Sequence, residues 1–132
     1  MATGVKEKLQ LVFFDVGQGD SILILSGGKA MQVDAGGVDA GLSLAGDILT
    51  FTDHIDSILF THAHEDHIGG LEHLFDSSAG ENIWPKEGFF FHGGDHEEYS
   101  GEARASSGRW TNISAGDLFR LGKASVQVVA AG

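Results

Sequence analysis

The sequence contains no cysteine, so disulfide bonds and thiolate metal ligands are both excluded. Proline occurs only once, and hydrophobic residues make up 42% of the chain, which favours a globular fold over a disordered one. No stretch reaches the ~20 apolar residues that a membrane helix needs. The first residues, Met1 to Leu9, are too polar for a signal peptide. We therefore expect a cytoplasmic protein without a membrane segment.

Basic residues are also scarce. The chain has 8 Lys and Arg residues and 19 Asp and Glu residues, which gives a formal net charge of −11. A surface this negative repels phosphate backbones and anionic lipids unless its charge is reversed locally, for example by bound divalent metals. The composition thus argues against tight nucleic-acid binding. A length of 132 residues is enough for one compact domain, and we treat residues 1–132 as a single unit.

Apolar runs separated by Gly-rich turns predict strands at residues 9–16, 21–25, 30–33, 55–61, 83–84 and 89–91. The first two are expected to pair as a hairpin, and residues 116–122 and 124–129 to form another. Apolar residues at helical spacing predict a helix over 41–51, and 69–75 is expected to begin a further one. The polar stretch 93–114 is expected to be a loop. Because both faces of the strands are mostly apolar, we expect a sheet buried inside a layered fold.

Three histidines and two acidic residues fall within the six positions 62–67, directly after the predicted strand 55–61. Imidazole nitrogen and carboxylate oxygen are the ligands that Zn²⁺, Mn²⁺ or Fe²⁺ prefers. In an extended segment His62 and His64 point to the same side and can hold one ion. If the chain then turns, Asp66 and His67 can reach a second ion. The sequence therefore predicts a metal site here.

The other histidines have simpler interpretations. His54 and His73 stand alone and are expected to be ordinary surface residues. His92 and His96 flank Asp95, but the two glycines between them make a shared helix face doubtful. We treat them as loop residues and do not include them among the ligands.

The cluster resembles a known signature. His-x-His-x-Asp-His followed by two glycines is similar to the metal-binding loop of the metallo-β-lactamase fold superfamily, and Asp34-Ala35-Gly36 is similar to that family's Asp-x-Gly element. More narrowly, the Phe-x-Asp-Val-Gly-Gln-Gly-Asp stretch at 13–20 and the loop at 61–71 resemble the hydrolase domain of the competence DNA-uptake protein ComEC and its soluble relatives. The resemblance covers residues 9–75 well and returns weakly at 116–129.

The resemblance implies an α+β fold, the αββα sandwich of that family, with two divalent metal ions as cofactors. Zinc is the expected metal, with manganese or iron as alternatives. His62 and His64 would bind the first ion, and Asp66 and His67 the second, with Asp66 also orienting the nucleophilic water. Asp34 has two interpretations that stay open here: a carboxylate that supports the His loop, or a residue that simply favours the turn.

The implied function is a metal-dependent hydrolase with a two-metal hydroxide mechanism, acting on a small molecule, a nucleotide or a nucleic acid, and by the narrower resemblance on a phosphodiester bond. The family's later ligands, a bridging Asp and further His residues, have no evident counterpart. We therefore expect only the first αβ half of the sandwich. The alternative is a non-catalytic metal-binding or scaffold fragment of a larger hydrolase. A half sandwich leaves a sheet face uncovered, so self-association is expected.

Overall fold

The computed structural model describes residues 8–17, 19–61, 70, 85, 88–91 and 110–129. The predicted strand at 83–84 lies outside these residues, as do most of the predicted helix at 69–75 and of the predicted loop at 93–114. Within the described part of the chain, no helix has both the length and the apolar character needed to span a bilayer.

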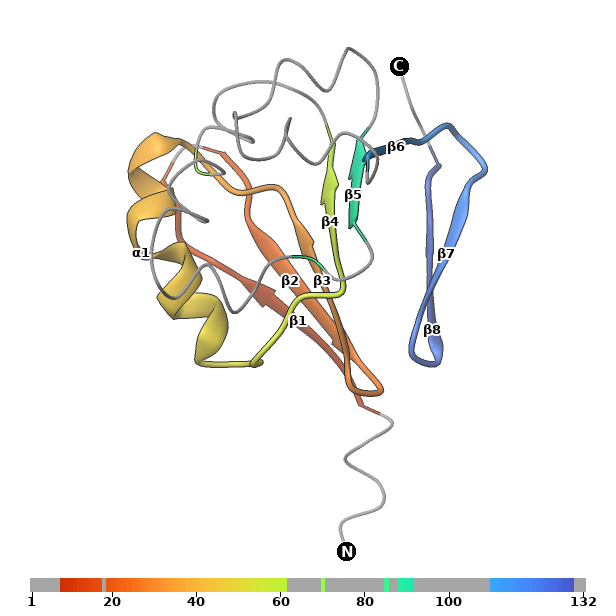
Figure 1. Ribbon diagram of the computed structural model, residues 1–132, viewed down its shortest axis with the longest axis horizontal. Coiled ribbons are helices and arrows are strands. Elements are labelled where there is room, and N and C mark those ends of the chain that lie inside the picture. Colours follow the sequence, from red (N-terminus) through yellow and green to blue (C-terminus); the bar gives the residue numbers. More distant parts are fainter. Residues whose placement is uncertain are drawn as a thin grey trace, which may run out of the picture.

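The centre of the fold is a mixed six-stranded sheet whose strands follow one another in chain order (Figure 1). The strands are β1 (Leu9–Phe13), β2 (Ile22–Ser26), β3 (Lys29–Val33), β4 (Ser57–Phe60), β5 (Gly88–Phe91) and β6 (Trp110–Asn112). The first three pair antiparallel, which confirms the predicted hairpin. From β3 to β6 the pairs are parallel, so the chain changes from hairpins to crossover connections after β3.

One face of this sheet is covered by helix α1 (Val38–Leu49), which connects β3 to β4. Leu44, Ala45 and Ile48 of the helix belong to the buried cluster that also contains Leu23 and Ile58 of the sheet. The helix was expected over 41–51, and it begins three residues earlier, directly after Gly37. Asp39 in its first turn favours this earlier start, because a negative charge stabilises a helix N-terminus.

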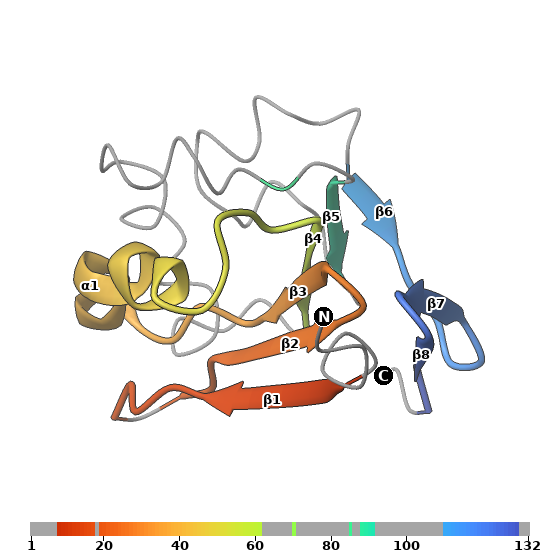
Figure 2. The ribbon, with the colours of Figure 1, turned by 90° about the horizontal axis from the view of Figure 1, so that it is seen from below.

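A two-stranded antiparallel hairpin covers part of the opposite face (Figures 1 and 2). It consists of β7 (Leu118–Leu121) and β8 (Ala124–Gln127), which confirms the predicted second hairpin. Leu121 of the hairpin is buried with Met31 of β3 and Leu59 of β4 in a second apolar cluster. The central strands β3 and β4 are thus packed on both sides, as the mostly apolar character of both strand faces predicted.

The hairpin docks through a backbone contact that requires glycine. Gly122, in the β7–β8 turn, has φ +59, and a Cβ atom built on it would lie 2.3 Å from the carbonyl oxygen of Ser26. A Cβ on Gly27, in the β2–β3 turn, would lie 3.2 Å from the Gly122 Cα. The two turns therefore approach so closely that a side chain at position 122 would push them apart.

Two further predictions differ from the structure. The first strand ends at Phe13 rather than at 16, because the chain turns at Asp15, whose carboxylate accepts a hydrogen bond from the Gly17 backbone. Residues Trp110–Asn112 form β6, although they fall within the predicted loop 93–114. Their local composition is polar, and they are a strand because they pair with β5, about twenty residues earlier in the sequence.

Candidate metal centre

Asp34 follows the end of β3 and points its carboxylate at the end of β4. It is buried, with 1% of its surface exposed, and it has a left-handed backbone with φ 56, which Asp tolerates better than most residues. Its Oδ1 accepts a hydrogen bond from the Thr61 backbone nitrogen at 2.9 Å. Its Oδ2 accepts one from the Thr61 hydroxyl at 2.6 Å. The carboxylate therefore fixes the residue that immediately precedes His62.

The turn at 34–36 is tied to both sides of the histidine segment. The Asp34 nitrogen donates to the Leu59 carbonyl at 2.9 Å, which continues the β3–β4 pairing. At the far side of the segment, the Gly70 nitrogen donates to the Gly36 carbonyl at 3.0 Å. Thr61 and Gly70, which flank residues 62–69, are thus both held by one three-residue turn. Asp34 therefore occupies a turn, and its carboxylate also holds Thr61, the residue before the His segment. That it supports the His segment itself stays a prediction.

Buried polar groups from β3 and from the residue before β2 support the same turn. The Gln32 side-chain nitrogen donates to the Ser21 hydroxyl and to the Asp34 carbonyl, both at 2.8 Å. The Gly36 nitrogen donates to the Asp20 carbonyl at 2.9 Å. Because unpaired buried polar groups are costly, these bonds favour one arrangement of the turn. Gln32 was not among the residues predicted from the sequence, although a polar residue within an apolar strand was a usable signal.

An apolar pocket of about 290 Å³ opens beside Thr61. It is formed where the C-terminal ends of β3 and β4 meet the end of the second hairpin. Its lining residues are Val33, Leu59, Thr61, Ile113, Val126, Gln127, Val128 and Val129. The edge of the sheet that leads into the His segment is therefore bordered on one side by aliphatic side chains.

A family model described as the metallo-beta-lactamase superfamily matches residues 14–128, which is most of the chain. The chain belongs to the metallo-beta-lactamase superfamily. The helix, the six-stranded sheet and the opposing hairpin are three successive layers of this superfamily's αββα fold. A comparison with curated protein sequences gives no match.

Solved structures of the same superfamily are similar in fold. The metallo-beta-lactamase SMB-1, bound to 2-mercaptoethanesulfonate, is 19% identical with a TM-score of 0.64, covering 87% of this chain and 48% of its own. GOB-18 from Elizabethkingia meningoseptica is 17% identical with a TM-score of 0.60, covering 98% and 53%. A diphosphatase from the PhnP family is 18% identical with a TM-score of 0.51, covering 80% and 41%. The chain spans about half the length of these structures.

The predicted ligands of this superfamily member, His62, His64, Asp66 and His67, lie outside the described residues, as do His73, His92 and His96. Within the described ranges, no group of three or more His, Asp or Glu residues is placed to hold a metal ion. Three imidazoles and one carboxylate suit zinc and similar divalent ions by their chemistry. The predicted donor set therefore fits the superfamily's metals.

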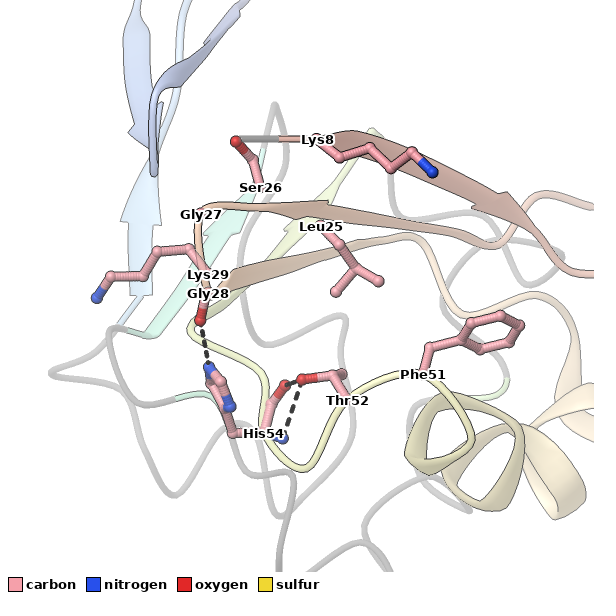
Figure 3. Close-up of a pocket in the computed structure, with 9 residues that line it drawn as sticks. All are labelled: Lys8, Leu25, Ser26, Gly27, Gly28, Lys29, Phe51, Thr52 and His54. Atoms are coloured by element: carbon pink, nitrogen blue, oxygen red, sulfur yellow. Dashed lines mark hydrogen bonds between the residues drawn. The ribbon is translucent and has the colours of Figure 1, made fainter. Parts of the chain in front are cut away.

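A second cavity, of about 240 Å³, lies at the opposite end of β3 and contains His54 (Figure 3). The His54 Nε2 lies 3.1 Å from the Gly28 carbonyl and 3.2 Å from the Asp56 carboxylate. Its Nδ1 lies 2.7 Å from the Asp53 carboxylate. The ring therefore links the β2–β3 turn to the segment before β4.

Proposed function

We propose that this protein is a metal-dependent hydrolase that holds two divalent ions, with His62 and His64 as ligands of the first and Asp66 and His67 as ligands of the second. Membership of the superfamily and the chemistry of the donor set support the assignment. The observation that carries it is the pair of hydrogen bonds that Thr61 donates to the Asp34 carboxylate, because they fix the strand end next to the first predicted ligand. Zinc is the proposed metal.

When bound, the two ions would supply hydroxide at neutral pH and stabilise negative charge that develops on the substrate. The residues of the chain have complementary roles. Asp66 is proposed to orient the attacking water as well as to bind metal. Asp34 and Thr61 act through the His segment, because carboxylates outside the ligand set commonly fix the orientation of the ligands and raise the metal affinity.

The proposed substrate is a small phosphodiester, such as a dinucleotide. The similarity of residues 13–20 and 61–71 to the competence hydrolase domain supports a phosphodiester, and the fold is also shared with a diphosphatase from the PhnP family. A net charge of −11 disfavours a long polyanion, since each added phosphate increases the repulsion. A short substrate that the metal ions can neutralise meets both constraints.

The test is hydrolysis of bis(p-nitrophenyl) phosphate by the purified chain loaded with Zn²⁺ or Mn²⁺, beside a β-lactam and a lactone. We expect metal-dependent release of nitrophenol that Asp66→Ala lowers by at least about 100-fold. Glu65→Gln is the matched control, because Glu65 lies in the same cluster without a proposed role, and it should keep the native rate. Bound metal without turnover of any substrate would favour the alternative, a non-catalytic metal-binding or scaffold domain.

A further inference from the structure

Gln32 is a fully buried polar residue in the middle of the six-stranded sheet. It lies on β3, where it pairs with Leu23 of β2 and with Ile58 of β4. Both neighbours belong to the apolar cluster that packs against α1. A polar side chain in such surroundings is costly unless its groups are hydrogen-bonded. Packing alone therefore does not explain a glutamine at this position.

The partners of the Gln32 amide fix its orientation. Its Nε2 donates to the Ser21 hydroxyl and to the Asp34 carbonyl, both at 2.8 Å. Because a backbone carbonyl can only accept, the amide atom that faces Asp34 has to be the nitrogen. Among the residues that the structure describes, no donor reaches the Gln32 Oε1. Gln32 thus makes these two bonds while its own buried acceptor is left unsatisfied, which few buried groups tolerate.

The residue that accepts the second bond has an unusual backbone conformation. Within the described ranges, Asp34 is the one residue other than glycine with a positive φ, at 56. Rotation about φ moves the carbonyl and the side chain of a residue together, so a bond that holds the Asp34 carbonyl also holds its carboxylate. That carboxylate accepts the two hydrogen bonds from Thr61 at the end of β4. The Gln32 amide therefore stabilises the conformation that brings Asp34 to Thr61.

We propose that Gln32 is a positioning residue of the metal centre, which holds Asp34 in the conformation that presents its carboxylate to Thr61. Gln32 acts through Asp34 and Thr61, and its effect on metal binding rests on the proposed function. Ser21 assists by accepting the second bond of the amide, so that the amide cannot turn away from Asp34. A residue that departs from the apolar pattern of its strand is typical of a functional site.

The first measurement is amide hydrogen exchange by NMR in the metal-free protein, for the native chain and for Gln32→Met. Methionine has a similar length but cannot donate to the Asp34 carbonyl. We expect the Thr61 amide to exchange at least about tenfold faster in the variant, because its acceptor is no longer held. The Ala30 amide, which donates to Asp56 at the other end of β3, reports any general destabilisation. An unchanged ratio of the two exchange rates would overturn the proposal.

The second measurement is zinc affinity, by competition with a fluorescent chelator, beside the midpoint of urea unfolding. Gln32→Met should weaken zinc binding at least about tenfold. The double variant Ser21→Ala/Gln32→Met also removes the hydroxyl that lost its donor, so its urea midpoint should lie above that of Gln32→Met. Its zinc affinity should stay low, because the Asp34 carbonyl is still not held. A zinc affinity that recovered together with the midpoint would indicate a merely structural role and overturn the proposal.

Gln10→Met is the matched control, because Gln10 is exposed on β1. The same substitution there should leave both the Thr61 exchange rate and the zinc affinity at their native values. The two measurements also separate this proposal from the proposed function, since hydrogen exchange needs no metal. Absence of zinc from the native chain would contradict the proposed function, whereas unchanged Thr61 exchange in Gln32→Met would contradict the role of Gln32.

Discussion

Replacement of Asp34 by alanine is expected to lower the free energy of unfolding by about 3 kcal/mol and to weaken metal binding by about 10- to 100-fold. The stability loss follows because the carboxylate is buried and accepts two hydrogen bonds from Thr61. Alanine would leave the Thr61 nitrogen without this partner, and it would also have to adopt a left-handed backbone at a cost of about 1 kcal/mol. The metal effect follows because Thr61 precedes His62.

Two further variants separate these contributions. Asp34→Asn keeps a residue that tolerates the left-handed backbone and can still accept one hydrogen bond, so its loss of stability should be smaller than that of alanine. Asp15→Ala is the control, because Asp15 is exposed and accepts a long 3.3 Å bond from Gly17, and it should change stability by less than about 0.5 kcal/mol. Urea unfolding and competition with a fluorescent zinc chelator measure the two quantities. An unchanged zinc affinity in Asp34→Ala would contradict the supporting role of this carboxylate.

Replacement of Asp56 by alanine is expected to cost a similar amount of stability, about 2–3 kcal/mol, without changing the metal affinity of the folded protein. Asp56 is also buried, and its Oδ2 accepts a hydrogen bond from the Ala30 nitrogen at 2.8 Å and lies 3.2 Å from the His54 ring. Lys29 lies 3.8 Å from its other oxygen. These contacts join β3 to β4 at the end of the sheet opposite Thr61, so the metal site should be unaffected.

Asp53, an exposed acidic residue near Asp56, provides the control for the Asp56→Ala variant. Asp53 also contacts the His54 ring, at 2.7 Å, but its side chain is 95% exposed. Solvent screens such a pair, so Asp53→Ala should have little effect on the urea midpoint. An Asp56→Ala variant that lost as much zinc affinity as Asp34→Ala would contradict this prediction. The loss of metal would then reflect general destabilisation, and not a specific effect of Asp34 on the His segment.

The parts of the fold that local sequence determines could be predicted. The strands β2 and β3 and the hairpin β7–β8 lie between Gly-containing turns and have apolar patterns that need no distant partner to be recognised. The short strand β6 could not be predicted, because Trp110–Asn112 are polar in context and become a strand only by pairing with β5. The helix α1 was recognised from its apolar spacing, but its first turn was missed, although Val38 continues that spacing four residues before Leu42.

The candidate site was also predicted in part. The ligand types were evident from residues 62–67, and their assignment to two metals stays a prediction because those residues lie outside the described part of the structure. The partner of Asp34 could not be read from the sequence. Asp34 reaches Thr61, 27 positions later, only because β3 and β4 pair in parallel with Val33 beside Leu59. That register is a property of the assembled sheet.

The most direct test of the central claim is the metal content per chain, measured by elemental analysis of the purified protein beside His64→Ala and His54→Ala. We predict close to two equivalents of zinc in the native chain and a sharp fall in His64→Ala. His54→Ala should keep both equivalents, because His54 lies at the other end of β3, with its ring between Asp53, Asp56 and the Gly28 carbonyl. Little or no metal in the native chain, or an equal loss in both variants, would contradict a metal centre at His62, His64, Asp66 and His67.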